Sequence, residues 1–224
     1  MTTPSMPSAR IPYLDVMPAI AVLRGVRPEE VTAIAGALFE AGFRIIEVPL
    51  NSPLPIESVA RLAAAFGDRC LVGAGTVCDP AMVERVADAG GRLIVSPHCD
   101  AHVIRAAKAR GLVCLPGVAT PTEAFTALKA GADGLKMFPA EQLPPAVLKA
   151  WRAVLPEGTP LIPVGGIGTG NIAAYWEAGA AGFGTGSSLY RTGASVESVF
   201  AAAMAFVAAL RSLPKRSQAV TTVG

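Results

Sequence analysis

One pattern recurs along the chain: a helical stretch ends in glycine, and a short apolar run follows it. The pattern appears in the fragments EAGFRIIEV, DAGGRLIVS, ARGLVCLP, KAGADGLKM and EAGAAGFGT, whose turn glycines are Gly42, Gly90, Gly111, Gly131 and Gly179. Glycine adopts the left-handed conformation that ends many helices without steric cost, so it predicts the helix end and the start of a strand. Helices that alternate with strands predict a parallel sheet.

Eight apolar runs fit the strand positions of this pattern. They are Ala19–Arg24, Ile45–Pro49, Leu71–Thr76, Leu93–Pro97, Val113–Gly117, Gly134–Pro139, Leu161–Gly165 and Gly182–Gly186. Strands this apolar are covered on both faces. The first run leads into Arg24-Gly25-Val26 without the GxGxxG turn of an open dinucleotide-binding sheet. Eight units in 224 residues therefore predict a closed (β/α)8 barrel.

We expect a single barrel over residues 17–212, with an N-terminal tail at 1–16 and a C-terminal tail at 213–224. Residues 1–10 lack the charged start and apolar stretch of a signal peptide, which favours a cytoplasmic protein. The four cysteines, Cys70, Cys78, Cys99 and Cys114, form no CxxC pair and are expected to be reduced thiols.

Composition excludes two classes of partner. The net charge is only +2, and no basic run is interleaved with aromatic residues, so nucleic acid is not expected. No apolar run reaches the roughly 18 residues that a membrane helix needs, so no membrane partner is expected. The 52% of hydrophobic residues is instead enough for a large core.

Three charged residues interrupt the apolar runs at the ends where barrel enzymes place their chemistry: Arg24, Glu47 and Lys136. A buried charge is costly unless it is paired, neutralised or used in function. The three side chains could simply form a buried ionic cluster. However, a cluster at the catalytic end of a barrel is more often a site, so we favour function.

A lysine in an apolar strand is suited to Schiff-base chemistry. Burial and a nearby cation such as Arg24 lower the lysine pKa, and the neutral amine of Lys136 can then attack a keto-acid carbonyl. Glu47 is the carboxylate expected to move protons. Phe138 either lines the pocket beside Lys136 or belongs to the core.

Glycine-rich segments end the last two runs, at Gly165-Gly166 and Gly186-Ser187. Backbone N–H groups without side chains can approach phosphate oxygens closely, and barrels often bind phosphate at these two loops. Tight turns are the alternative explanation.

Several separated segments resemble the family of 2-keto-3-deoxy-6-phosphogluconate and 4-hydroxy-2-oxoglutarate aldolases. They are Ile45–Ser52, Val72–Val77, Leu93–Pro97, Leu135–Ala140 and Pro163–Ile167, and the resemblance runs from about Pro18 to Leu210. The segments Glu47–Pro53 and Leu189–Gly193 look more like the galactonate-type members, the 2-dehydro-3-deoxy-6-phosphogalactonate aldolases.

This resemblance implies a role for each site residue. Lys136 falls on the Schiff-base lysine, Glu47 on the general acid/base, and Thr76 on a threonine near the substrate carboxylate. The phosphate-binding backbone falls on Gly165, Gly166, Gly186 and Ser187. Asn51 stands where many gluconate-type members have an arginine that holds the carboxylate, so Arg24 is the expected substitute. The resemblance also implies a homotrimer.

We therefore expect a class I lyase that cleaves 2-dehydro-3-deoxy-6-phospho-D-galactonate to pyruvate and D-glyceraldehyde 3-phosphate without a metal or cofactor. The residues alone leave open the C4 epimer, that is, the 6-phosphogluconate substrate, and 4-hydroxy-2-oxoglutarate. A sugar-phosphate isomerase or epimerase is the next enzyme class, although only one strand carboxylate is present. A non-catalytic binding barrel and a metal site at His98 and His102 are weaker alternatives.

Overall fold

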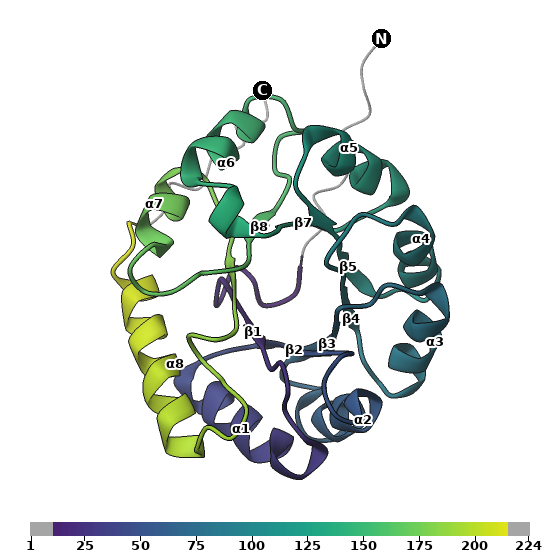
Figure 1. Cartoon of the computed structure of the whole chain (residues 1–224), viewed down its shortest axis with the longest axis vertical. Helices are drawn as coiled ribbons and strands as arrows, with labels where there is room; N and C mark the ends of the chain where they lie inside the picture. Colours follow the sequence, from purple (N-terminus) through teal and green to yellow (C-terminus); the bar gives the residue numbers. More distant parts are fainter. Residues whose placement is uncertain (1–10, 215–224) are drawn as a thin grey trace, which may run out of the picture.

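The computed structural model describes residues 11–214, in which parallel strands form a barrel surrounded by helices (Figure 1). The strands are β1 (Ala19–Val22), β2 (Ile45–Pro49), β3 (Leu71–Gly75), β4 (Leu93–Val95), β5 (Val113–Leu115), β6 (Gly117–Val118), β7 (Leu135–Met137), β8 (Leu161–Pro163) and β9 (Phe183–Thr185). Most of the two expected tails, residues 1–10 and 215–224, lies outside the described residues.

The strands close into a ring. One sheet has the order β5-β4-β3-β2-β1-β9 and the other the order β6-β7-β8. The chain itself joins β5 to β6, and a parallel bridge between Val164 and Gly184 joins the end of β8 to β9. The predicted (β/α)8 barrel is therefore confirmed.

The fifth predicted strand, Val113–Gly117, is broken in two by Pro116. β5 pairs with β4, whereas β6 pairs with β7. Proline has no N–H to donate to a ladder, so the pairing changes sides at this residue. The Pro116 carbonyl still accepts a hydrogen bond from the Lys136 N–H at 3.0 Å, which ties the break to β7.

The helices cover the outside of the barrel. They are α1 (Pro28–Ala41), α2 (Pro55–Phe66), α3 (Pro80–Asp88), α4 (Ala101–Ala109), α5 (Pro121–Ala130), α6 (Pro145–Arg152), α7 (Ile172–Glu177) and α8 (Val196–Arg211), with a 3-10 turn η1 (Ala140–Gln142) after β7. Asp79 and Asp100 cap α3 and α4, and Thr120 and Glu123 form a capping box on α5. No helix within residues 11–214 is long and apolar enough to span a membrane.

The core has two parts. The larger one lies between strands and helices, and the smaller one fills the barrel with side chains such as Ile20, Ile45 and Ile162. Ile11 and Leu14 belong to this inner cluster, so part of the segment expected to be a tail packs against the barrel interior. The inner cluster is apolar and fills one end of the barrel. The charged strand residues lie toward the opposite end of the barrel.

The four cysteines are free thiols. Cys70 and Cys114 are buried, whereas Cys78 is exposed. Burial raises the pKa of Cys114 to about 12, so this thiol is inert at neutral pH.

Candidate functional site

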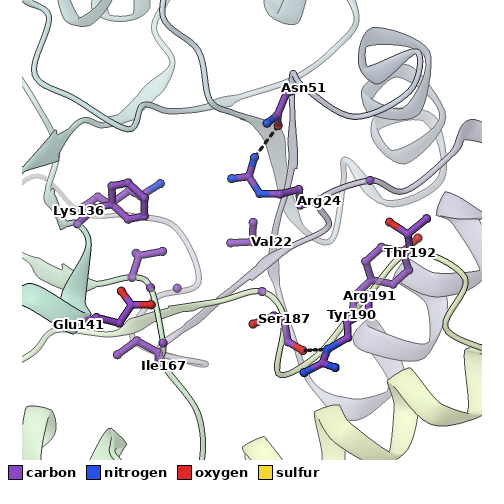
Figure 2. A pocket seen from close by; sticks show the side chains of 17 residues that line it. Val22, Arg24, Asn51, Lys136, Glu141, Ile167, Ser187, Tyr190, Arg191 and Thr192 are labelled. Carbon is purple, nitrogen blue, oxygen red and sulfur yellow. Dashed lines mark hydrogen bonds between the residues drawn. The ribbon is translucent and has the colours of Figure 1, made fainter.

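A pocket of about 500 Å³ opens at the C-terminal ends of the strands (Figure 2). Predicted site residues that line it are Arg24, Lys136, Phe138, Gly165, Gly166, Gly186 and Ser187. Glu47 lines a smaller cavity inside the barrel, and Lys136 lines both cavities. Residues from five strands and the loops that follow them (β1, β2, β7, β8 and β9) thus meet at the larger cavity.

Lys136 lies at the centre of β7, between Gly117 of β6 and Ile162 of β8. The residue is 5% exposed, and its Nζ lies 4.6 Å from the centroid of the Phe138 ring. Burial lowers the pKa of the Lys136 ammonium below its ordinary value, the nearby Glu47 opposes that shift, and Arg24 adds to it. A lowered pKa increases the fraction of neutral, nucleophilic amine.

Glu47 lies on β2, is 2% exposed, and its Oε2 has no hydrogen-bond partner among the described residues. Burial raises the pKa of the Glu47 carboxyl to about 7, although Lys136 and Arg24 both act to lower it. A carboxyl group that titrates near neutral pH is suited to give and take protons. Gly75 is required beside it, because a Cβ at that position would overlap the Glu47 carboxylate.

Arg24 follows β1 and is held by the loop after β2. Its Nη1 donates a hydrogen bond to Asn51 Oδ1 at 2.6 Å, which is drawn in Figure 2. The neighbouring Gly25 N–H donates to Ser52 Oγ at 2.9 Å, so both loops are tied together twice. Asn51 therefore orients Arg24, the residue expected to hold the substrate carboxylate.

The glycine-rich loops form the opposite part of the pocket. Gly165 and Gly166 have φ angles of 104° and 64°, which favour glycine, and a Cβ on either would press against the Glu141 side chain. Asn171 holds this loop by donating from Nδ2 to the Gly166 carbonyl at 2.8 Å. The free backbone here and at Gly186 can approach an anion closely.

Thr76 is the one predicted site residue that lines neither cavity. It directly follows β3 and has a φ of 56°, in the left-handed region that a β-branched residue rarely adopts. Backbone strain of this kind costs about 1–3 kcal/mol and often occurs at functional sites. The sequence contained no signal for this conformation.

Glu141 and Tyr190 are among the pocket residues that the sequence did not indicate. Tyr190 donates a hydrogen bond to Glu30 Oε1 at 3.0 Å and so fastens the loop after β9 to the start of α1. Burial and this bond raise the pKa of Tyr190 to about 12. Glu141 could have been noticed as an acidic residue that follows the lysine strand by a few positions.

The histidines sit at the start of α4. Asp100 accepts a hydrogen bond from the His102 backbone N–H at 2.7 Å and caps the helix, so His98 precedes the first turn. Within residues 11–214, no group of three or more His, Cys, Asp or Glu side chains is arranged to hold a metal ion.

Known proteins resemble this chain over most of its length. The family described as KDPG and KHG aldolase matches residues 11–202. A protein of Rhizobium meliloti named probable 2-dehydro-3-deoxy-6-phosphogalactonate aldolase is 50% identical over 86% of this chain and 91% of its own. An Escherichia coli protein named 2-dehydro-3-deoxy-6-phosphogalactonate aldolase is 48% identical over 87% and 95%. A solved structure described as native KDPGal has a TM-score of 0.86, with 48% identity over 87% and 95% of the two chains.

Proposed function

Because this chain belongs to the KDPG and KHG aldolase family, we propose that it cleaves 2-dehydro-3-deoxy-6-phospho-D-galactonate into pyruvate and D-glyceraldehyde 3-phosphate. The observation that carries this proposal is the buried pair of Lys136 and Glu47 at the C-terminal end of the barrel, in a chain about half identical to two proteins named for that substrate. The reaction is an aldol cleavage, and the enzyme is a lyase.

Lys136 forms the covalent intermediate. Its neutral amine attacks C2 of the keto acid, and the Glu47 carboxylic acid protonates the carbinolamine hydroxyl, which leaves as water to give the iminium and the Glu47 carboxylate. When the C3–C4 bond breaks, its electron pair moves into the iminium and leaves an enamine on the lysine. The burial that favours a neutral Lys136 supports this role.

Glu47 moves the protons. Its carboxylate takes the proton of the C4 hydroxyl as the C3–C4 bond breaks, and the aldehyde leaves. The resulting carboxylic acid returns the proton to C3 of the enamine. Water then hydrolyses the iminium to pyruvate and free lysine, and the released proton goes to the Glu47 carboxylate, which restores the starting acid. A pKa of about 7 and a free Oε2 support both transfers.

Arg24 holds the carboxylate of the keto acid, with its guanidinium oriented by Asn51. Thr76 donates to the same carboxylate from the rim of β3, and Phe138 packs against the three-carbon unit. The pairing of Arg24 with Asn51 supports the galactonate-type assignment, because Arg24 takes the place of the arginine that many gluconate-type members have at the position of Asn51.

Backbone N–H groups of Gly165, Gly166, Gly186 and Ser187 bind the phosphate at C6. This assignment is supported by the two loops that carry these residues, because both line the same pocket with backbone that few side chains cover. Arg191, which also lines the pocket and donates to the Ser187 carbonyl at 3.2 Å, adds positive charge nearby.

We also propose a homotrimer that works in the cytoplasm. The outer face of α8 supports self-association, since Val196, Phe200 and Met204 form an apolar stripe and are 37%, 38% and 42% exposed. A stripe of this kind is typical of a protein contact.

The substrate is tested by offering the purified protein each C4 epimer and coupling pyruvate release to lactate dehydrogenase. We expect kcat/KM for the galactonate to exceed that for the gluconate by about tenfold or more, a difference of roughly 1.4 kcal/mol in transition-state binding. Lys136→Met should abolish release, whereas Lys129→Met, on the exposed side of α5, should not. A preference for the gluconate would overturn the substrate assignment, and no release from either epimer would overturn the function.

A further inference from the structure

Glu141 is a pocket residue to which the mechanism above gives no part. It lies on η1, directly after β7, and its side chain reaches the pocket wall near Gly165 and Gly166 (Figure 2). Among the residues that line the pocket, the charged ones are Arg24, Lys136, Arg191 and Glu141, so Glu141 is the single anion in that lining.

The backbone around Glu141 is held firmly. The Ala140 N–H donates to the Val164 carbonyl at 2.8 Å, and the Tyr175 hydroxyl donates to the carbonyls of Ala140 and Leu143 at 2.8 and 3.2 Å. Ala140 itself is 1% exposed. The position of the Glu141 Cα is therefore set by two neighbouring segments, the end of β8 and helix α7, rather than by a free loop.

The space that the Glu141 carboxylate occupies depends on two glycines, which have no Cβ to fill it. A Cβ on Gly165 would lie 2.5 Å from Glu141 Oε2, and a Cβ on Gly166 would lie 2.8 Å from its Cγ. Within residues 11–214, the Glu141 carboxylate has no hydrogen-bond or ion-pair partner. The glycines thus keep a free acceptor at the pocket wall.

A phosphorylated hydroxy acid brings hydroxyl donors into this pocket. The C4 hydroxyl belongs to Glu47, which takes its proton, and the C6 phosphate belongs to the glycine loops. We expect the C5 hydroxyl between them, and the side chains of Val22, Val164 and Ile167 offer it no acceptor. Glu141 lies beside the glycines and is the one anionic acceptor in the pocket lining.

We propose that Glu141 accepts a hydrogen bond from the C5 hydroxyl and makes the enzyme select hydroxylated aldehyde phosphates. This assignment rests on the proposed function. A carboxylate beside the phosphate loop repels a phosphate, so it favours binding only where a hydroxyl engages it. An aldehyde phosphate without that hydroxyl meets the repulsion alone.

The test removes the hydroxyl and the carboxylate separately, in the synthetic direction with pyruvate. The aldehydes are D-glyceraldehyde 3-phosphate, whose C2 hydroxyl becomes the C5 hydroxyl of the product, and 3-oxopropyl phosphate, which lacks it. The proteins are the parent chain, Glu141→Ala, Glu141→Gln and, as a control, Glu157→Ala at an exposed site away from the pocket.

We expect Glu141→Ala to lower kcat/KM for D-glyceraldehyde 3-phosphate by about tenfold to a hundredfold, the range for one hydrogen bond to a charged group. It should leave kcat/KM for 3-oxopropyl phosphate unchanged or raised, with Glu141→Gln between. Equal losses or equal gains on both aldehydes, or no change on either, would overturn the proposal. If the parent chain makes no product from either aldehyde, the proposed function itself fails.

Discussion

Glu47 and Lys136 are both pushed toward their neutral forms by the same cause, burial in the barrel. Burial raises the pKa of Glu47 to about 7 and lowers that of Lys136, while their mutual attraction opposes both shifts. Burial therefore raises the fraction of neutral amine on Lys136, and near neutral pH the Glu47 carboxyl group can exchange its proton. This is the state that the proposed chemistry requires.

The buried Glu47 should lower the free energy of unfolding, and the size of this loss should depend on pH. Its pKa is about 7 in the folded chain, against an ordinary value of 4.5 for a solvated glutamate. Well below pH 4.5 the group is protonated in both the folded and the unfolded chain. As pH rises from there through about 7, only the unfolded chain gains from ionisation, and folding loses about 3 kcal/mol. Glu47→Gln should therefore be stabilising, relative to the parent, at pH 8 and not at pH 4.

Urea unfolding of both proteins at pH 4 and pH 8 measures this difference, with Glu157→Gln as an exposed control. A stability change that is the same at both pH values would contradict the buried, raised pKa. The same variant should lose about 10²- to 10⁴-fold in cleavage rate, the usual contribution of a general acid or base.

Single residues were predictable where their chemistry conflicts with their surroundings. Lys136 and Glu47 stand out as charges in apolar runs, and the structure brings them to adjoining cavities. The hydrogen bond from Arg24 to Asn51 and the left-handed backbone of Thr76 were not predictable, because both depend on how separate loops meet.

At the scale of elements, local rules accounted for most boundaries. The five turn glycines have φ angles between 68° and 117°, so the repeated glycine signal was confirmed. The break between β5 and β6 was missed, although Pro116 is the physical reason for it. The turn η1 was missed as well, because its hydrogen bonds involve Val164 and Tyr175, which are distant in sequence.

The capping box on α5 gives an element-scale prediction. Thr120 Oγ1 accepts from the Glu123 N–H at 3.3 Å, and Glu123 Oε2 accepts from the Thr120 N–H at 2.8 Å. Thr120→Ala should lower the free energy of unfolding by about 1 kcal/mol and leave kcat/KM unchanged. Thr122→Ala, on the same exposed turn, is the control for chemical unfolding. Equal effects of the two substitutions would argue against the cap.

For the whole molecule, the count of strand and helix units was enough to predict the barrel. It did not predict how the barrel closes between its last strands or which residues fill its interior from before β1. Closure between β8 and β9 depends on a bridge between Val164 and Gly184, and Ile11 and Leu14 fill the inner cluster from before β1. These contacts join segments that are far apart in the chain, so no local sequence pattern predicts them.

The proposed trimer gives a prediction at this scale. Phe200→Glu places a charge in the apolar stripe of α8, where burial against another copy would be costly. Light scattering should give three times the mass of one chain for the parent and a smaller mass for the variant. Val154→Glu, at a residue 57% exposed and away from α8, should remain trimeric. A parent of single-chain mass, or a Phe200→Glu trimer, would contradict the assembly.

The central claim is that Lys136 forms a Schiff base, and borohydride trapping tests it most directly. The protein is incubated with pyruvate, reduced with borohydride, digested, and analysed by peptide mass spectrometry. We expect one reduced pyruvate adduct, on the peptide that contains Lys136, and none on the Lys136→Met variant. An adduct on a different lysine, or no adduct while a chelator abolishes the activity, would contradict it.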